Sequence, residues 1–407
     1  MKHSVAYDPR SAEVLENPFP TYQRLREETP VQFYDGLPVP YYIVFRHEDV
    51  RNASSNVEQF TARYGSTPRY AEPNVMLNDG DTHLAFRLVV QGRFTPKAME
   101  RYRAMVRQIA AGLLDEMIAT GAPADVFEHL AMPMPVKSTL RLIGVDDENY
   151  REMGMLADHA LLSGWMVLPP EQEAHIARRG PEIYEGWLQE RETLLAKAGV
   201  TTPTKAHVGT VLPDDILSDI LVGQVEGRPL TRSEQHHLLQ LMVVGGGDTT
   251  AHLISNLIWR LLEDRSRWET VLADPERLIP VAVEESLRFD SPGLGLFRTT
   301  ARALELHGET IPAHAKVQMS YPSANRDPSV FSDPDTFRLD RPMAEMRKHL
   351  TFGAGAHLCL GQHLARLEAT TLLRELIERL PTLRLAGETA RTENYGFWGR
   401  RKLPVGW

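Results

Sequence analysis

The sequence has a single cysteine in 407 residues, so the chain by itself forms no disulfide and no thiolate-rich zinc or iron–sulfur site. It also lacks a long hydrophobic run. No stretch approaches the roughly 20 apolar residues that span a bilayer, and the N-terminus lacks the apolar core of a secretion signal. We therefore expect a cytoplasmic protein without a membrane segment.

A basic excess is missing as well. The 45 Lys and Arg are outnumbered by 54 Asp and Glu, for a net charge of −9, which argues against a dedicated nucleic-acid binder. With 42% hydrophobic and 24% charged residues the composition is that of a globular protein, not of a disordered chain, collagen or a coiled-coil rod. No internal repeat, dinucleotide-binding glycine pattern, His-Glu-x-x-His or Walker lysine loop occurs.

What the sequence does contain is mostly helical pattern. The clearest helix opens with the capping box Thr231-Arg232-Ser233-Glu234 and, if unbroken, runs to about Glu263. Strand patterns concentrate in residues 31–60 and 297–341. No alternation of strands and helices appears, so we expect a mainly α fold with a small β region rather than a doubly wound sheet.

The lone cysteine lies in an unusual context, Phe352-Gly353-Ala354-Gly355-Ala356-His357-Leu358-Cys359-Leu360-Gly361. Three glycines so close together indicate a loop with special dihedral angles and a group approaching closely. A predicted helix from Gln362 follows, and a helix N-terminus favours a thiolate. A single cysteine is usually an inert buried hydrophobe, but this context favours a functional thiolate.

A second glycine run lies inside the long helix, Val244-Gly245-Gly246-Gly247-Asp248-Thr249-Thr250. Three glycines in a helix interior cost about 3 kcal/mol relative to alanine. Either they allow close packing of another helix, or the helix opens locally against a flat ligand. An acid beside an alcohol, as in Asp248-Thr249, can deliver protons to a reacting group.

Both motifs resemble those of the cytochrome P450 family. Residues Phe352, Gly353, Gly355, His357, Cys359 and Gly361 match every fixed position of its haem-binding signature. The resemblance implies that Cys359 is the thiolate ligand of haem b (iron protoporphyrin IX) and that Phe352, Gly353 and Gly246 also adjoin the cofactor. Asp248 and Thr249 then match the oxygen-activating acid–alcohol pair. The implied fold is a single domain, residues 1–407, with haem buried between the long central helix and the cysteine loop.

Further residues gain a role only from this resemblance. His83 and Arg87, spaced i and i+4, with Arg298 and His357, are the implied ligands of the haem propionates. Glu285 and Arg288 resemble the family's structural Glu-x-x-Arg, which takes a third partner from the coil before the cysteine loop. The usual arginine before Phe337 is Thr336 here, so Arg338 and Arg341 both remain candidates. His349 is expected to support the cysteine loop, and Leu403-Pro404-Val405 to form the closing strand.

The resemblance implies a monooxygenase that uses dioxygen and receives electrons from a separate ferredoxin or flavodoxin with its reductase. It hydroxylates, or O- or N-dealkylates, a small hydrophobic substrate in a pocket lined by the 61–80 loop and by apolar residues (Leu241, Val244, Leu294, Leu296, Phe397 and Trp398). The expected docking face for the electron donor is basic (Arg87, Arg93, Arg347, Lys348 and Arg366). A peroxygenase or coupling oxidase, or a haem or hydrophobic-ligand carrier without turnover, remains as an alternative. His236 and His237 are expected to be solvated.

Overall fold

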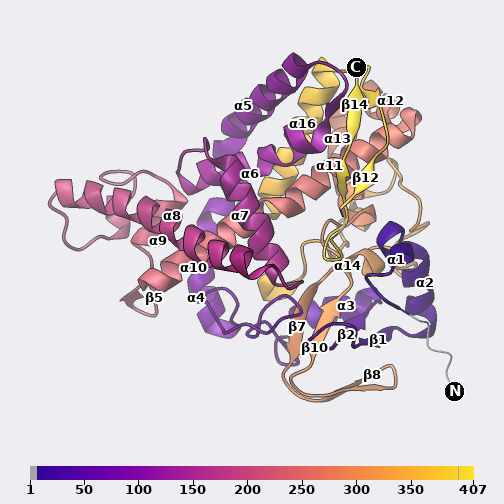
Figure 1. The fold of residues 1–407 in the computed structure, drawn as a ribbon, viewed down its shortest axis with the longest axis horizontal. Coiled ribbons are helices and arrows are strands. Elements are labelled where there is room, and N and C mark those ends of the chain that lie inside the picture. The colour runs from indigo at the N-terminus through magenta and orange to yellow at the C-terminus, as the bar shows by residue number, and fades with distance from the viewer. Residues whose placement is uncertain (1–6, 393) are drawn as a thin grey trace.

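The computed structural model describes residues 7–392 and 394–407, and helices make up most of it (Figure 1). This confirms the prediction of a mainly α fold with a small β region. The helices are α1 (Ala12–Glu16), α2 (Phe19–Glu28), α3 (His47–Ser55), α4 (Gly80–Gln91), α5 (Pro96–Thr120), α6 (Pro133–Ile143), α7 (Tyr150–Ser163), α8 (Pro170–Lys197), α9 (Ile216–Leu221), α10 (Arg232–Gly246), α11 (Asp248–Glu263), α12 (Arg265–Ala273), α13 (Pro275–Phe289), α14 (Tyr321–Ala324), α15 (Met343–Met346) and α16 (Gln362–Arg379).

The principal sheet has five strands in the order β1-β2-β10-β7-β3, built from the two regions where strands were predicted. Strand β10 runs parallel to β2, and the other neighbours are antiparallel. In this register Lys316 of β10 lies opposite Tyr41 of β2 and Thr299 of β7. The strands are β1 (Val31–Tyr34), β2 (Tyr41–Val44), β3 (Phe60–Thr61), β7 (Leu296–Thr300) and β10 (Lys316–Met319).

The remaining short strands form one three-stranded sheet and three two-stranded sheets. The predicted closing strand exists as β14, which pairs with β11 and β4. The others form two-stranded hairpins, of which β8–β9 projects at the lower edge of Figure 1. Their bounds are β4 (Ala124–Asp125), β5 (Gln224–Val225), β6 (Arg228–Pro229), β8 (Leu304–Leu306), β9 (Glu309–Ile311), β11 (Arg384–Leu385), β12 (Ala390–Arg391), β13 (Arg400–Lys402) and β14 (Pro404–Gly406).

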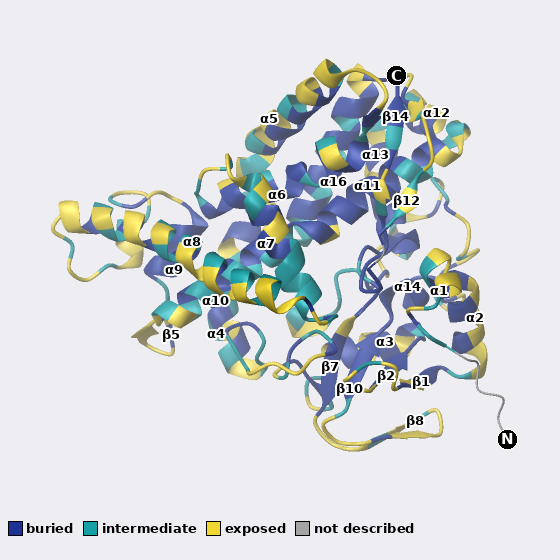
Figure 2. Cartoon of the chain, in the orientation of Figure 1, coloured by how far each residue is buried: buried dark blue, intermediate teal, exposed yellow. Residues whose placement is uncertain are grey.

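The long central helix is broken rather than continuous to Glu263. It begins with the predicted capping box at Thr231, and α10 ends at Gly246. Gly247 leaves the helical conformation with φ −87° and ψ −87°, and α11 starts at Asp248. Helix α11 is nevertheless mostly buried, and it packs against α6, α13 and α16 (Figure 2). The break therefore lies at the glycine run, in which Gly247 is buried and Gly245 is exposed.

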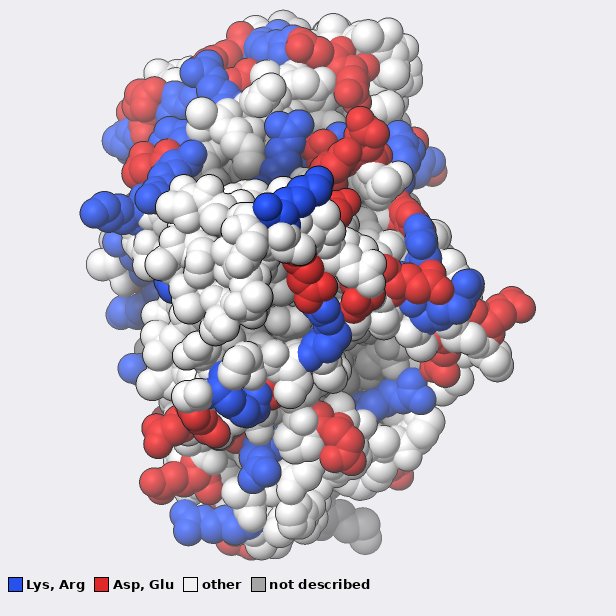
Figure 3. Space-filling model, turned by 90° about the vertical axis from the view of Figure 1, so that its left-hand side faces the viewer, with Lys and Arg blue, Asp and Glu red and all other residues white. Residues whose placement is uncertain are grey.

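None of the described helices is both long and apolar enough to cross a membrane. On the face drawn in Figure 3, basic and acidic side chains are intermixed, without a wide area of one sign. Such a face does not present the basic stripe that nucleic-acid binding requires.

Candidate functional site

The cysteine loop has the backbone that its glycines predict. Gly353 and Gly355 both have φ +72°, a conformation that favours glycine, and a Cβ on Gly355 would lie 2.8 Å from the Cα of Ser55 in α3. The amide of Cys359 donates to the carbonyl of Phe352 at 2.9 Å, which closes the loop. Helix α16 begins three residues after the cysteine. The thiol is thus held at the start of a helix by a tightly folded loop.

The surroundings of the thiol include several groups that favour its ionised form. Cys359 is solvent-accessible, but the protein atoms crowded around it raise the pKa of the thiol. The backbone N–H groups of Gly361 and Gln362 and the charges of Arg87 and Arg366 act against this effect. These are the donors and cations that lower a cysteine pKa.

Four basic residues predicted to bind propionates come together beside this loop. The rings of His83 and His357 lie 4.1 Å apart, and Arg87 donates to the carbonyl of Leu358 at 2.8 Å. Burial, together with the positive charges of His357, Arg87 and Arg298, lowers the pKa of His83 to about 4. Arg298 is buried, and its Nε has no partner among the described residues. The cluster therefore holds unused donors and positive charge.

One residue that sequence reasoning missed fixes His357. The carboxylate of Asp79 accepts from His357 Nε2 at 3.0 Å, from the amide of Ala62 at 3.1 Å and from the hydroxyl of Thr61. Asp79 precedes α4, but nothing in the sequence indicates that its side chain reaches a loop 278 residues away.

These residues fit a haem group. A haem with a sulfur ligand needs a thiolate and cationic donors for two propionates. The loop offers one thiol with N–H groups and arginines around it, and the adjoining cluster offers four basic side chains with a buried, unpartnered Arg298 Nε.

The glycine run divides into glycines with different roles. A Cβ on Gly246 would lie 2.2 Å from Thr139 Oγ1 in α6, so close packing explains this glycine. A Cβ on Gly245 would meet no atom within 4 Å. The carbonyl of Gly245 in α10 accepts from Thr249 Oγ1 in α11 at 3.4 Å, and both residues are exposed. The structure therefore makes Gly245, not the predicted Gly246, the glycine on the open face.

The predicted acid Asp248 lies away from this open face. It is 5% exposed, and burial, with the charge of Asp158 on α7, raises its pKa to about 7. Arg401 on β13 opposes that rise and donates to Asp158 Oδ2 at 3.1 Å. Asp158 and Arg401 were not found from the sequence, because they come from distant elements.

The predicted pocket residues fall into two groups. Leu241 and Val244 lie on the same side of α10 as Gly245 and are half-buried. Phe397 bridges to Gly293, next to buried Leu294 and to Leu296, which is 40% exposed. Trp398 does not belong to this group, because its Nε1 donates to Asp290 at 3.0 Å and its ring packs on Phe19.

The structure shows which residue is the third partner of the Glu285–Arg288 pair. Arg288 donates through Nη2 and Nε to the two carboxylate oxygens of Glu285, at 2.7 and 2.8 Å. Arg341 reaches the same oxygens at 3.1 and 3.2 Å, whereas Arg338 contributes only its backbone amide at 3.0 Å. The side chains of Glu285, Arg288 and Arg341 are all fully buried. Arg341 is therefore the residue that replaces the missing arginine.

The expected basic docking face is smaller than predicted. Arg93 is buried and paired with Asp219 at 2.6 Å, so it is not a surface cation. Arg366 binds Glu284 through two contacts, at 2.8 and 2.9 Å, and its guanidinium lies 4.6 Å from the centre of the Phe352 ring. His349 also contacts Glu284, at 3.5 Å. Arg347 and Lys348 remain exposed.

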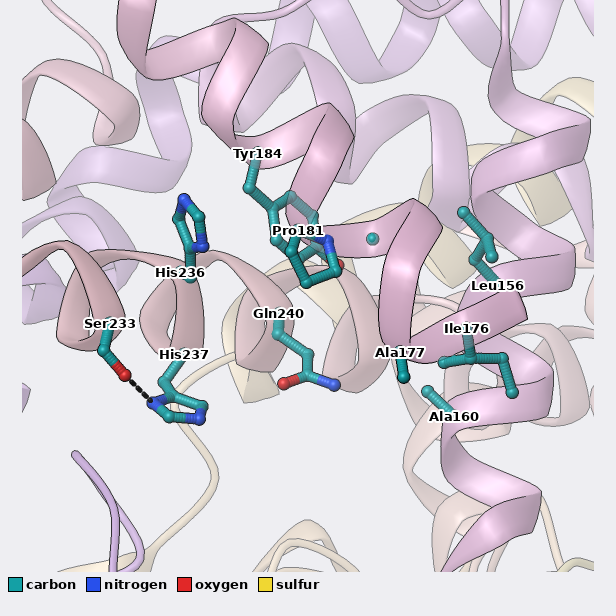
Figure 4. Close-up of a pocket in the computed structure, with 11 residues that line it drawn as sticks. Leu156, Ala160, Ile176, Ala177, Pro181, Tyr184, Ser233, His236, His237 and Gln240 are labelled. Carbon is teal, nitrogen blue, oxygen red and sulfur yellow. Dashed lines mark hydrogen bonds between the residues drawn. The ribbon is translucent and has the colours of Figure 1, made fainter. Parts of the chain in front are cut away.

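A separate cavity of about 470 Å³ lies between α7, α8 and α10, and none of the predicted pocket residues lines it (Figure 4). Its walls are apolar on α7 and α8, with Leu156 and Ile176, and polar on α10, with Ser233, His237 and Gln240. His236, expected to be solvated, is half-buried here and contacts Glu185 at 3.1 Å.

Comparison with known proteins agrees with this arrangement. The family model for cytochrome P450 matches residues 205–383. Nocardicin C N-oxygenase of Nocardia uniformis is 32% identical over 381 residues, covering 90% of this chain and 89% of that protein. The β-dihydromenaquinone-9 omega-hydroxylase of Mycobacterium tuberculosis is 30% identical over 401 residues, covering 98% of this chain and 78% of that protein.

Solved structures show the same fold. P450BioI in complex with an acyl carrier protein ligated to hexadec-9Z-enoic acid superposes with a TM-score of 0.83 at 26% identity, over 98% of this chain and 100% of that one. CYP109E1 from Bacillus megaterium in complex with testosterone superposes with a TM-score of 0.80 at 29% identity, over 96% and 99% of the two chains.

Proposed function

This chain belongs to the cytochrome P450 family and is a monooxygenase, and from that premise we propose the roles of its residues and the class of its substrate. We propose that residues 1–407 act as one domain that binds haem b through Cys359. The observation that carries the proposal is the meeting of two features at one place. The glycine-shaped thiol loop adjoins a cluster of four basic side chains.

In this proposal Cys359 Sγ would bind the haem iron, and His83, Arg87, Arg298 and His357 would bind the propionates. Asp79 orients His357, since it accepts from that ring at 3.0 Å. Phe352 and Gly353 form the loop wall beside the sulfur, and the ring of Phe352 is fixed by the guanidinium of Arg366. When bound, haem supplies the redox chemistry that activates dioxygen.

The residues on the other side of the site handle protons. Asp248, with a pKa of about 7, can both hold and release a proton near neutral pH, which is the property of an effective general acid. Thr249 carries its hydroxyl on the open face of the helix break. We propose that the Asp248 carboxyl takes up and releases protons from the side of the helix where Asp158 and Arg401 lie. We propose that the Thr249 hydroxyl donates a proton on the side that faces the pocket.

The substrate is proposed to be a small hydrophobic molecule. Leu241, Val244, Leu294, Leu296 and Phe397 offer apolar contacts, as expected of a pocket that selects by shape and area. Three of the four named relatives and neighbours support this class, since their names give β-dihydromenaquinone-9, hexadec-9Z-enoic acid and testosterone, whereas the fourth is named for nocardicin C. Hydroxylation or O- or N-dealkylation is the proposed outcome.

Electrons are proposed to come from a ferredoxin or flavodoxin with its reductase. The exposed cations Arg347 and Lys348 lie a few residues before the cysteine loop. An acidic partner docking there would be steered by their charge.

The test is the spectrum of the purified protein after reduction and addition of carbon monoxide. We expect the red-shifted Soret band that only thiolate ligation produces, and we expect Cys359→His to replace it with the band of an imidazole complex. A wild-type protein with the imidazole-type band, or a Cys359→His protein that keeps the thiolate band, would contradict the assignment.

Oxygen consumption then separates the enzyme from its alternatives. With ferredoxin, reductase and a spin-shifting hydrophobic ligand, we expect electron-dependent oxygen uptake and an oxygenated product. A ligand carrier would bind haem without uptake, and a peroxygenase would turn over only with peroxide.

A further inference from the structure

Lys316 is a lysine that the proposed function leaves without a role. It occupies the first position of β10, in the middle strand of the five-stranded sheet, and is 0% exposed. A buried ammonium is strongly destabilising unless hydrogen bonds and nearby dipoles compensate for its lost hydration. The side chain therefore needs partners, and those partners indicate what it does.

Its partners are backbone carbonyls of one loop. Lys316 Nζ donates to the carbonyl of Tyr64 at 2.6 Å and to that of Gly65 at 3.0 Å. It also lies 4.9 Å from the ring centre of Tyr70, within range of a cation–π contact. Tyr70 in turn donates its hydroxyl to the carbonyl of His314 at 2.5 Å. Segment 62–71 is thus folded around the ammonium group.

The same segment is closed by its own backbone and attached to the sheet. The amide of Ala71 donates to the carbonyl of Tyr64 at 3.1 Å, the same oxygen that Lys316 binds. The amide of Phe297 in β7 donates to the carbonyl of Ser66 at 2.9 Å. Phe297 follows Leu296, so the segment lies beside one of the apolar residues assigned to the substrate pocket.

The far side of the segment meets the connection between α7 and α8. Arg69 donates to the carbonyl of Ser163 at 2.8 Å and contacts Glu173 at 3.2 Å, with both charged side chains largely exposed. The side chain of Thr67 packs so closely on Gly164 that a Cβ there would lie 2.6 Å away. The segment therefore extends from the sheet to this connection, and its buried attachment is at Lys316.

The charged and titratable groups around Lys316 leave it cationic at neutral pH. Burial, with the charge of Arg298 on β7, lowers its pKa to about 8. Tyr41 on β2 and Tyr70 in the loop face it, and burial raises the pKa of both, so they stay neutral in this range. His314 also lies beside this lysine, and its backbone carbonyl accepts the hydrogen bond from the Tyr70 hydroxyl.

We propose that Lys316 is a positioning residue that fixes segment 62–71 as a wall of the substrate pocket. The size of hydrophobic ligand that the enzyme accepts then depends on a lysine that does not touch the ligand. The inference rests on the proposed function, because it takes the space beside Leu296 as the place where the substrate binds.

The first test is amide hydrogen exchange in the full-length protein, for Lys316→Met, Lys316→Arg and the control Lys97→Met, which removes an exposed lysine from α5. We expect exchange at Ala71 to rise about tenfold or more in Lys316→Met, because the lost bonds involve a charged donor. Exchange at Leu376 in the core of α16 should not change. Lys316→Arg should restore most of the protection, and Lys97→Met should match the wild type. Unchanged exchange at Ala71 in Lys316→Met would overturn the proposal.

A second measurement uses the wild type and Lys316→Arg, and so does not depend on Lys316→Met folding. In the wild type, protection of Ala71 relative to Leu376 should fall as the pH rises through about 8, because the ammonium loses its proton there. In Lys316→Arg it should stay constant over this range. A flat profile in the wild type would count against the role of Lys316.

The pocket itself is tested with the haem-loaded protein and two iron ligands, imidazole and 1-phenylimidazole. Imidazole needs little space, whereas the phenyl ring must fit against the wall. We expect the ratio of their dissociation constants to change at least threefold in Lys316→Met and to return in Lys316→Arg. An unchanged ratio despite faster exchange at Ala71 would show that the segment is not a pocket wall. Absence of the thiolate band would instead refute the proposed function and leave the exchange results to judge Lys316.

Discussion

The cysteine side of the site and the pocket side are held by different kinds of contact. Behind the cysteine loop, Glu285, Arg288 and Arg341 form an ion cluster with no exposed side-chain surface. On the pocket side, Arg69 and Glu173 make the contact between loop and helix while 49% and 40% exposed. The first arrangement stabilises one geometry, whereas the second permits adjustment at the end of segment 62–71 that lies farthest from its buried attachment to Lys316.

The difference matters because the two sides do different work. A metal ligand must stay in one place, so the loop that carries it benefits from fully satisfied buried charges. A pocket that admits a substrate must loosen and close, and segments that move are drawn from weakly held parts of a structure. The comparison predicts that substitutions on the two sides change different observables.

The largest expected effect is on folding and comes from the cysteine side. Glu285→Ala leaves the buried guanidinium of Arg288 without a carboxylate and leaves Arg341 with Glu345 alone, so we expect a loss of about 3–5 kcal/mol in the free energy of unfolding. Arg69→Ala, the counterpart on the pocket side, should cost less than about 1 kcal/mol because exposed ion pairs contribute little. Urea unfolding followed by circular dichroism measures both. Equal losses of stability in the two variants would contradict the claim that the two sides are held by contacts of different strength.

The next effect is on turnover and leaves the fold intact. Asp248→Asn removes the proposed proton donor, so we expect product formation to fall by a factor of about 100 or more. The thiolate band should remain, because Asp248 lies beside Asp158 and Arg401 and is not part of the cysteine loop. Rapid product analysis and the carbon monoxide spectrum measure the two properties separately.

Thr249→Ala serves as the companion variant for that experiment. It removes a hydroxyl from the open face, so electron consumption should continue while less product forms per electron pair. Product yield that stays proportional to electron use would argue against the proton-delivery role of Thr249.

The sequence predicted the cysteine side better than the pocket side for a physical reason. The loop from Phe352 to Gly361 is local, and its glycines require positive φ angles that can be anticipated from residue type alone. Glu285 and Arg288 are likewise neighbours on one helix. The family resemblance of these local motifs therefore supplied the predictions that the geometry supports, including the cluster of His83, Arg87, Arg298 and His357.

The contacts that the sequence left open or missed all join residues far apart in the chain. Arg341 rather than Arg338 completes the buried cluster because the coil turns its side chain inward. Asp79 reaches His357, and Arg401 reaches Asp158, only after the chain has folded. Residue type and periodicity contain no information on such pairings, and the break of the long helix at Gly247 was one of two open alternatives.

A smaller effect concerns the dependence of stability on pH. The folded protein holds the proton of Asp248 up to about pH 7, whereas an unfolded chain releases it near pH 4. The folded state therefore binds more protons between these values, and this residue makes the free energy of unfolding fall as the pH rises from about 4 to 7.

Replacing Asp158 tests that dependence. Asp158→Asn removes the neighbouring negative charge, so the pKa of Asp248 should fall and the loss of stability above pH 5 should shrink. Asp248→Asn should abolish this component. Urea midpoints at several pH values for the three proteins measure it, and parallel curves would contradict the shared environment of the two acids.

The smallest expected effect is on electron delivery. Reversing Arg347 and Lys348 to Glu together should slow reduction by a ferredoxin about tenfold at low salt and flatten its dependence on ionic strength, because long-range attraction is lost. Arg228→Glu, at an exposed pair on β6, changes the net charge without touching this surface and should leave the rate near the wild-type value. The thiolate band should be identical in all three proteins, since the buried cluster behind Cys359 is untouched. Slowing by Arg228→Glu to the same degree would show that net charge, not the surface before the cysteine loop, governs the encounter.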